Sequence, residues 1–395
     1  MGNQDLLAIA RDWSYWDREP PESVPRAVDL PESLSNRTAL VIQGVRRCGK
    51  STLLAQLIGR YGLERENCLF VNFEDPRLAG NLDFECLEGF TQAFAKARPG
   101  AAPLTVLLDE IQWVRGWERW LAAKLERPGR FRFVVSGSNA HLLSGELATV
   151  LTGRHITVEL FPFDLAEFRK LRPGASLMDH LHRGGFPEPI GGGDGDRLLR
   201  QYFSDILQRD VRERVGARSS LGLRQVVQMV FESAGAELSL RRIAGASGIA
   251  VETVAAYLEA CEQAYLLFSC PWFAFSQRKR AHRNRKYYPV DTALRRVSVT
   301  PAGQDLGKAL ECATFVELRK RGFDVFYWRD AGEVDFVVQS AQSTKAPIPI
   351  QVTLNGPSER HLRSLDAFHE AHPHAAEAAI VNLNNFPDAL AEIPK

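Results

Sequence analysis

The residues best suited to do chemistry lie in a loop that starts at Gly44 and ends with Gly49-Lys50-Ser51. Four residues separate the two glycines, which is the spacing of a phosphate-binding loop between a strand and a helix. Glycine lets backbone N–H groups approach a phosphate closely, and the following helix N-terminus adds unpaired N–H groups and partial positive charge. In this pattern the lysine reaches the β- and γ-phosphates, and the serine hydroxyl binds Mg²⁺.

The segments that flank this loop support the same interpretation. Residues 39–42 form an apolar strand pattern before the loop, and a helical pattern opens at Lys50 or Ser51. The alternative is a chance glycine turn before a surface helix. Such a turn would not need an apolar strand before it, so the flanking patterns favour the phosphate-binding loop. We therefore predict an ATP and Mg²⁺ site whose phosphate cradle comprises Gly44, Val45, Arg46, Arg47, Cys48, Gly49, Lys50, Ser51 and Thr52.

A pair of acids supplies the second half of the predicted site. Residues 105–108 form a buried strand pattern that runs directly into Asp109 and Glu110. Asp109 is predicted to hold the Mg²⁺ shell, and Glu110 to orient and polarise the attacking water. The alternative is an acid pair that caps the next helix, and the phosphate-binding loop upstream favours the catalytic interpretation.

Two further residues are candidates for contact with the γ-phosphate. Asn139, or its neighbour Ser138, follows the strand pattern of residues 131–136, although turns also favour such polar residues. Arg154 could stabilise charge on a phosphate of its own chain or of a neighbouring subunit, which would make the protein a homo-oligomer. The alternative for Arg154 is a surface side chain beside a turn.

The elements that must position these residues have the pattern of a parallel sheet. Near-continuous apolar segments at residues 39–42, 69–73, 105–108 and 131–136 alternate with helical stretches, which indicates a sheet covered on both faces. We predict an ATPase domain over residues 1–160, with the aromatic N-terminal segment packed across it. Residues 161–215 are mostly helical with a glycine-rich interruption and are interpreted as a helical lid.

The middle of the chain has the rhythm of a helix-turn-helix. Helical patterns over residues 221–234, 240–247 and 251–264 are followed by a strand pattern at 266–270, which predicts a winged-helix domain over 216–300. A basic segment follows, and with the adjacent helix-turn-helix it predicts DNA contact through phosphates, although a solvated basic loop is the alternative. Its predicted contact residues are Arg278, Lys279, Arg280, Arg283, Arg285 and Lys286.

The composition of the chain argues against a zinc protein, a membrane protein and a protein that binds nucleic acid through its overall charge. The 395 residues carry a net charge of +1, so any affinity for nucleic acid must be local. The six cysteines include no Cys-x-x-Cys pair, which argues for reduced thiols and against a zinc site. We find no signal peptide and no apolar run of 18 residues, so we expect a cytoplasmic protein without membrane contact.

The last region, residues 301–395, alternates helix and strand patterns. Asp335 lies on a strand, and the strand pattern of residues 348–353 follows it. This layout is typical of a metal-dependent nuclease core, in which two carboxylates bind Mg²⁺ and a lysine two positions after the second steadies the attacking water.

Seven segments together carry a resemblance to a known family: GVRRCGKST, VLLDEIQ, SGSN, LTGR, GGFPEP, KYYPVDTALR and GEVDFVV. The chain resembles bacterial and archaeal AAA-type P-loop ATPases with a C-terminal domain of unknown function, and the segments cover nearly its whole length. The resemblance implies an α/β architecture: an AAA-type parallel sheet core, a helical and winged-helix middle, and a C-terminal restriction-endonuclease-like fold. It also implies ATP and Mg²⁺ at Gly44, Gly49, Lys50, Ser51, Asp109 and Glu110.

The sequence departs from the pattern of active nucleases. The acid-x-Lys positions fall on Gln351 and Thr353, so one metal ligand is neutral and the ammonium is missing. Asp335 remains, with Glu311 or Glu317 as the helix acid. We therefore expect this domain to be inactive or strongly impaired as a nuclease, and to serve as a binding or assembly module. The function predicted is ATP hydrolysis coupled to a DNA-interacting C-terminal half; the alternatives are a nucleotide-gated DNA-binding or scaffold protein with slow hydrolysis, and an ATP-dependent nuclease.

Overall fold

The computed structural model describes residues 2–101, 103–138, 150–151, 153–216, 219–300, 305–340 and 346–394. The chain divides into two compact units, Met1–Leu160 and Phe161–Lys395, which are described separately. The first contains a parallel sheet and the second a helical region followed by a mixed sheet. The α/β fold class predicted from the sequence is thus confirmed.

The first unit is built on a five-stranded sheet in the order β2-β3-β4-β1-β5, in which every neighbouring pair is parallel. Because parallel strands all end at the same edge of a sheet, the loops that follow β1, β3 and β4 meet there. The strands are β1 (Ala39–Gln43), β2 (Cys68–Asn72), β3 (Leu104–Asp109), β4 (Phe131–Gly137) and β5 (His155–Glu159).

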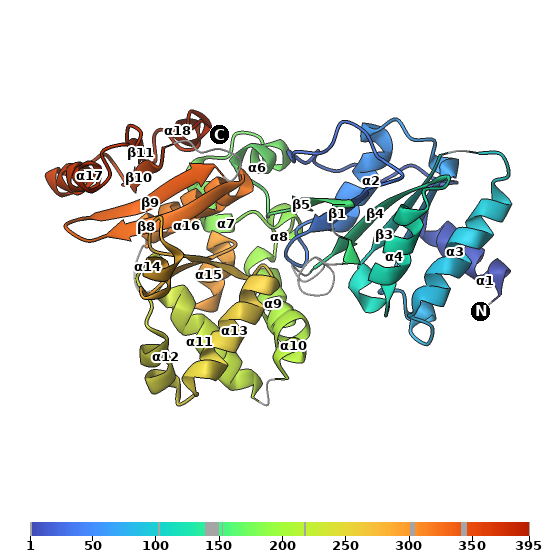
Figure 1. Ribbon diagram of the computed structural model, residues 1–395, viewed down its shortest axis with the longest axis horizontal. Helices are drawn as coiled ribbons and strands as arrows, with labels where there is room; N and C mark the ends of the chain where they lie inside the picture. Colours follow the sequence, from blue (N-terminus) through green and yellow to red (C-terminus); the bar gives the residue numbers. More distant parts are fainter. Residues whose placement is uncertain are drawn as a thin grey trace. The chain divides into compact units, whose positions relative to one another are not determined.

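Helices cover both faces of this sheet (Figure 1). Alternate strand residues such as Val41, Val71 and Val106 share one buried cluster with apolar side chains of α1, α3 and α4, while α2 contacts the sheet from the other side. The helices are α1 (Asn3–Trp13), α2 (Lys50–Arg60), α3 (Phe84–Ala97) and α4 (Trp117–Glu126), with short 3₁₀ turns η1 (Arg65–Asn67), η2 (Pro76–Leu78) and η3 (Ile111–Trp113).

The N-terminal aromatic residues lie against the β2 edge of the sheet. The Trp16 indole donates a hydrogen bond to the Cys68 carbonyl over 2.7 Å, and its ring stacks on Phe94. The Trp13 indole donates to the Asp75 carboxylate, also over 2.7 Å. These rings therefore hold the N-terminal segment on the core, and their polar atoms are already engaged.

The second unit begins with a helical region, residues 161–216. A π-helical turn, η5 (Ile206–Arg212), continues α9 and joins it to α10. The helices are α6 (Leu165–Leu171), α7 (Leu177–Arg183), α8 (Pro187–Gly191), α9 (Gly195–Asp205) and α10 (Glu213–Val215).

Three helices and a two-stranded antiparallel hairpin follow, as the helix-turn-helix pattern predicts. A left-handed Gly248 ends α12, so the chain turns immediately into α13. These elements are α11 (Ser220–Glu232), α12 (Leu240–Ser247), α13 (Val251–Gln263), β6 (Leu267–Cys270) and β7 (Lys286–Pro289), with a short helix α14 (Gln277–Ala281) between the strands and α15 (Thr292–Ser298) after them.

The C-terminal region forms a four-stranded sheet in the order β11-β10-β9-β8. The pairs β8-β9 and β9-β10 are antiparallel and β10-β11 is parallel. Phe273, from the segment between β6 and β7, lies fully buried in the core beneath this sheet. The elements are α16 (Leu306–Lys320), β8 (Phe323–Arg329), β9 (Glu333–Ser340), β10 (Ile348–Val352), α17 (Glu359–Ala371), β11 (Ala379–Val381) and α18 (Asp388–Ala391).

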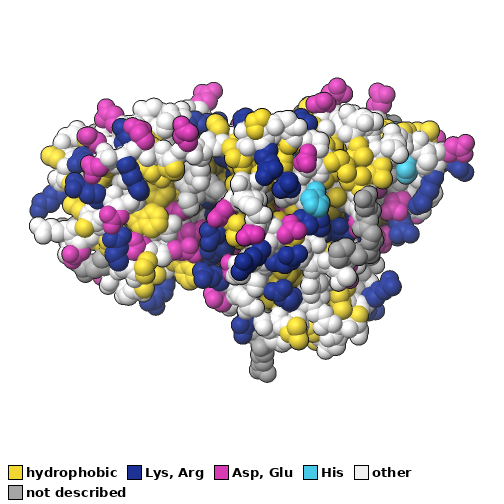
Figure 2. All heavy atoms as spheres, turned by 180° about the vertical axis from the view of Figure 1, so that it is seen from behind, with side chains coloured by type: hydrophobic (Ala, Val, Ile, Leu, Met, Phe, Trp, Pro, Cys, Tyr) yellow, Lys and Arg dark blue, Asp and Glu magenta, His cyan; other side chains and the backbone are white. Residues whose placement is uncertain are grey.

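The last features of the fold concern the charges on the surface and the length of the helices. Acidic and basic side chains are intermingled on the face that Figure 2 shows, in keeping with the small net charge. Among the helices of the described residues, none has both the length and the apolar character needed to cross a membrane.

Candidate nucleotide-binding site

The loop after β1 has the close-packed backbone that the sequence predicts. A Cβ atom on Gly44 would lie 2.1 Å from the Leu160 carbonyl oxygen, so no larger residue fits there. Gly49 adopts a left-handed conformation with φ of 100° immediately before α2 begins at Lys50. This places the first turn of α2, with its unpaired N–H groups, at the loop.

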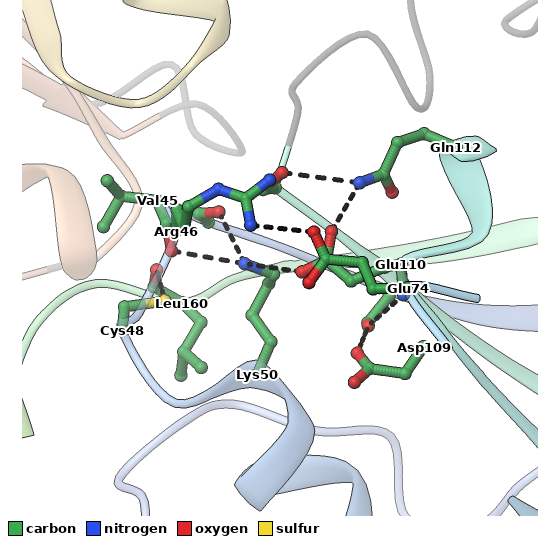
Figure 3. Close-up of polar contacts among 12 residues, drawn as sticks. Val45, Arg46, Cys48, Lys50, Glu74, Asp109, Glu110, Gln112 and Leu160 are labelled. Carbon is green, nitrogen blue, oxygen red and sulfur yellow. Dashed lines mark hydrogen bonds and ion pairs between the residues drawn. The ribbon is translucent and has the colours of Figure 1, made fainter. Parts of the chain in front are cut away.

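The side chain of Lys50 is buried inside this loop (Figure 3). Its Nζ donates hydrogen bonds to the carbonyl oxygens of Gly44 and Val45, each over 3.2 Å. The same nitrogen lies 3.7 Å from Oε1 of Glu110, at the end of β3. The lysine and the second acid of the predicted site are thus brought together from opposite sides of β4.

Asp109 is fully buried and held from both neighbouring strands. Asn72, the last residue of β2, donates to its Oδ2 over 2.9 Å, and the Ser136 hydroxyl of β4 donates to its Oδ1. Burial, followed by the charge of Glu110, raises the pKa of Asp109, while hydrogen bonds from Ser136 and Ser51 act in the opposite direction. The hydrogen bond from Ser51 places the two predicted Mg²⁺ ligands next to each other.

Glu110 has a left-handed backbone with φ of 54°, which is costly for a residue with a Cβ. Its carboxylate faces Lys50 and accepts a hydrogen bond from the Gln112 side chain. Burial opposes ionisation, but Lys50 and then Gln112 outweigh it, so the pKa of Glu110 lies below its ordinary value. Glu110 is therefore held as a carboxylate, the form a general base requires.

Two arginines brace the loop. Arg46 forms an ion pair with Glu74, just beyond β2, over 2.9 Å. Arg26, from the N-terminal segment, is buried and donates to the Cys48 carbonyl over 2.7 Å. The Cys48 thiol packs inward against the Leu160 carbonyl, and burial raises its pKa. The Arg47 side chain is exposed, and its backbone has φ of 70°.

The donor set of this loop fits a nucleoside triphosphate with Mg²⁺. The cradle would be filled by a Cβ at Gly44, the helix N-terminus faces it, and one ammonium and two oxygen ligands converge on it. Lys50 and the loop amides would hold the phosphates, and Ser51 with Asp109 would hold the metal.

The remaining predicted residues of this unit are placed differently. Asn139 lies outside the described residues, whereas Ser138 is buried near Gln112, with 3.4 Å between the Ser138 hydroxyl and Gln112 Nε2. Arg154 accepts a hydrogen bond at its carbonyl from Ala39, the first residue of β1, and its side chain pairs with Glu126 at the surface. The P-loop follows the other end of β1, about 16 Å away along the strand. The prediction that Arg154 acts on its own chain's nucleotide is therefore wrong, and action on a neighbouring subunit stays a prediction.

In the second unit, the basic segment is only partly at the surface. Arg278, Lys279, Arg283 and Arg285 are exposed, and Arg280 is half-buried above the Phe326 ring. Lys286 does not belong with them, because it is 1% exposed and its Nζ binds Glu333 over 2.9 Å. As the first residue of β7, it points into the unit rather than toward solvent. The predicted phosphate contact through Lys286 is therefore wrong.

The nuclease-like positions come together in part. Gln351 donates through its amide to Asp335, and the Val352 N–H donates to the same carboxylate over 2.8 Å. Thr353 is buried and its hydroxyl has no partner among the described residues. Burial and the charge of Glu311 raise the pKa of Asp335, which identifies Glu311 as the helix acid beside it.

The prediction that Glu317 is the helix acid of this cluster is wrong. It lies six residues after Glu311 on α16, which corresponds to about 240° around the helix, so the two acids face different neighbours. Glu317 lines a separate cavity of about 270 Å³ together with Lys320 and His180. Burial raises the pKa of Glu317 there.

Several residues around the nucleotide site were missed at the sequence level. Asn72 and Ser136 are the polar ends of the strands on either side of β3, and this shared position in otherwise apolar segments was an available signal. Gln112 lies in the VLLDEIQ segment, only two residues from Glu110. Arg26 and Glu74 offered no signal, because their partners are distant in the sequence.

A parallel sheet that carries a glycine-lysine-serine loop after β1 and an acid pair after β3 defines a P-loop protein of the AAA type. An AAA-domain family model matches residues 36–169, and models of two domains of unknown function (DUF8612 and DUF4143) match residues 174–303 and 306–394. An uncharacterized protein of Haemophilus influenzae is 30% identical over 341 residues, 81% of this chain and 84% of its own. A second, from Methanocaldococcus jannaschii, is 30% identical over 338 residues, covering 78% and 74%. The chain belongs to this family of AAA-type proteins with a C-terminal domain of unknown function.

Solved structures give looser matches. The Aeropyrum pernix ORC1 protein in complex with DNA has a TM-score of 0.31 and 14% identity, covering 66% of this chain and 86% of that chain. AMPPCP-bound DnaA from Aquifex aeolicus has a TM-score of 0.29 and 17% identity, covering 58% and 82%. Superpositions this loose establish neither activity nor partner for the present chain.

Proposed function

We propose that this protein binds ATP with Mg²⁺ and hydrolyses it at the loop after β1. Lys50 and the loop amides bind the β- and γ-phosphates, and Ser51 and Asp109 hold the metal. Bound Mg²⁺ would neutralise charge that develops on the phosphate oxygens. Glu110 orients a water molecule and accepts its proton, since a carboxylate held in its ionised form is ready to act as a base.

The observation that carries this proposal is the convergence of Lys50, Asp109 and Glu110. Lys50 follows β1 and the two acids lie at the end of β3, and β4 separates these strands in the sheet, yet the ammonium lies 3.7 Å from one acid. Here a second buried carboxylate stands beside it, with a raised pKa that a cation would relieve.

The experiment is a steady-state ATPase assay with and without Mg²⁺, paired with equilibrium binding of ATP. We expect Mg²⁺-dependent turnover that Glu110→Gln abolishes while ATP binding is retained. An absence of both binding and turnover in the wild-type protein would overturn the proposal.

We further propose that nucleotide turnover acts on a DNA-binding surface in the second unit. The exposed cations of the segment between β6 and β7 support it, together with the ring of Phe275, which is 68% exposed. The exposed side chains of α13 do not contribute, because they include Glu252 and Glu259 and this helix contains no lysine or arginine. DNA contact would therefore be a contact with phosphates, without reading of bases by α13.

This surface can be tested by DNA binding at two salt concentrations. We expect affinity to fall with salt and the salt dependence to weaken in a variant with Arg278, Lys279 and Arg283 replaced by alanine. The matched control replaces Arg363, an exposed arginine of α17 paired with Glu359. Equal binding by wild type and the triple variant would remove the DNA proposal and leave the ATPase proposal standing.

A nucleotide-gated scaffold with slow hydrolysis is favoured by one specific observation. Lys50 is bound to two loop carbonyls and faces Glu110, so a nucleotide must displace these contacts before its phosphates are held. Single-turnover rates with and without DNA separate the candidates. A rate that stays slow under both conditions would support the switch, and a rate raised by DNA would support the coupled ATPase.

The nuclease alternative has one observation for it and one against. The buried ammonium of Lys286 supplies, from β7, the positive charge that Thr353 lacks. However, no group of three or more His, Cys, Asp or Glu side chains in the described part of the chain could hold a metal. Plasmid cleavage with Mg²⁺ or Mn²⁺, lost in Asp335→Ala, would favour the nuclease; no cleavage would favour a binding module.

A further inference from the structure

Gln112 lies beside the general base of the proposed reaction and has no role assigned so far. It is in the 3₁₀ turn η3, two residues after Glu110, and its Nε2 donates a hydrogen bond to Glu110 Oε2 (Figure 3). The same nitrogen lies 3.4 Å from the Ser138 hydroxyl at the end of β4. Its other amide atom, Oε1, is buried and has no hydrogen-bond partner among the described residues.

We propose that Gln112 is a positioning residue that fixes the Glu110 carboxylate for catalysis, an inference that rests on the proposed ATPase function. The amide bridges the ends of β3 and β4, the strand ends where the site is built. The left-handed backbone of Glu110 sets the direction in which its Cβ leaves the chain, and the hydrogen bond from Gln112 holds its carboxylate in place.

The need for such a support follows from what ATP binding does to Lys50. In the present arrangement Lys50 faces Glu110 Oε1, but binding of phosphates draws the ammonium away from the carboxylate. The hydrogen bond to Oε2 from Gln112 does not involve the loop, so it persists when the lysine moves. Because the amide donates, it also favours the ionised carboxylate over the acid.

The charged groups that face Glu110 define what a change at Gln112 will do. They are Lys50 and Arg46 from the loop and the adjacent Asp109, while Glu74 neutralises Arg46 from the end of β2. Removing the amide leaves these unchanged and deletes one donor to the carboxylate. The carboxylate of Glu110 then loses the contact that fixes its orientation, so the chemical step slows while the phosphate cradle is unchanged.

The test compares the full-length wild type with Gln112→Ala and the isosteric Gln112→Glu. We expect kcat for ATP to fall about 10- to 100-fold in Gln112→Ala, the range for loss of a hydrogen bond to a charged group. ATP affinity should stay within about threefold, because Gln112 is not part of the phosphate cradle. Gln112→Glu should also lower kcat while ATP affinity is retained, because its carboxylate repels that of Glu110 instead of donating a hydrogen bond to it.

The matched control is Gln92→Ala, because Gln92 makes the same type of hydrogen bond to Glu88 on the exposed side of α3. Its kcat and its ATP affinity should equal those of the wild type. A Gln112→Glu variant with normal kcat would show that only the shape of the side chain matters and would overturn the inference. That outcome leaves the ATPase proposal intact, whereas absence of turnover in the wild type overturns both.

Discussion

Lys50 and Glu110 face each other across the nucleotide site, with 3.7 Å between the ammonium nitrogen and Oε1 of the carboxylate. Both side chains are buried, and the charge of Lys50 lowers the pKa of Glu110 against the effect of burial. The roles of the two residues can be tested separately: Lys50 should govern binding of the phosphates, and Glu110 should govern the chemical step.

Replacing Lys50 by alanine should remove the ammonium that holds the β- and γ-phosphates. We expect ATP affinity to fall and turnover to drop by about 100-fold or more, the usual cost of one buried charge-stabilising donor. Lys124→Ala is the control, since Lys124 is a partly exposed lysine of the same unit that pairs with Glu88. Binding measured by titration calorimetry that is equal in the two variants would contradict this assignment.

Glu110→Gln should separate binding from hydrolysis. The amide keeps the size of the side chain but cannot accept a proton, so turnover should fall about 10²- to 10⁴-fold. Affinity should be retained or rise, because the carboxylate no longer competes with the phosphates for Lys50. A burst of product in a rapid-quench assay at the wild-type rate would exclude Glu110 as the base.

The turn at Gly184 and Gly185 should be sensitive to any side chain. Gly184 has φ of 71°, and a Cβ there would lie 2.4 Å from the Asp291 carboxylate, which accepts the Gly185 N–H over 2.6 Å. We expect Gly184→Ala to lower the free energy of unfolding by about 3 kcal/mol, from backbone strain and overpacking.

The control for this prediction is Gly174→Ala. Gly174 has φ of 80° but no atom within 4 Å of its would-be Cβ, so it retains the strain and lacks the clash. A loss of about 1–2 kcal/mol is expected there. Equal losses in the two variants, measured by urea unfolding, would show that the contact with Asp291 contributes nothing.

Lys286 should stabilise the second unit rather than bind an external ligand. It is the buried cation among Glu311, Glu333 and Asp335, so Lys286→Met leaves these acids without their partner. We expect a loss of about 3–5 kcal/mol. Lys308→Met removes a half-exposed lysine and should change stability by about 0.5 kcal/mol or less. Equal melting curves for wild type and Lys286→Met would contradict this role.

Asp75 predicts an acid-dependent loss of stability in the first unit. Hydrogen bonds from Arg77, and then from Trp13, lower the pKa of Asp75 from 3.8 to about 2 against the effect of burial. A depressed pKa means that the stabilisation is present above pH 3.8 and disappears as the pH falls toward 2. We expect about 1–2 kcal/mol, reduced by solvent around the half-exposed Arg77. Unfolding followed by tryptophan fluorescence should show this pH dependence in the wild type but not in Asp75→Asn.

The sequence by itself determined the parts of the protein that depend on short-range pattern. The phosphate-binding loop from Gly44 to Ser51 could be predicted, because its spacing is set by the size of a phosphate and by the strand and helix that flank it. The positions of Asp109 and Glu110 could be predicted because they directly follow an apolar strand pattern, which places them at the carboxyl edge of the sheet. The helices α12 and α13 and the glycine turn between them followed from the same local rules of periodicity, whereas the winged-helix domain stays a prediction.

Only the tertiary structure decided which distant residues share a site. Arg154 was separated from its own loop by the direction of β1, and Glu317 from Asp335 by the turn angle of α16. Lys286 lies among the acids of the C-terminal sheet although 48 residues separate it from Asp335 in the sequence. Such pairings depend on strand order and on which face of an element is buried. Since both result from packing of the whole unit, no short segment of the sequence records them.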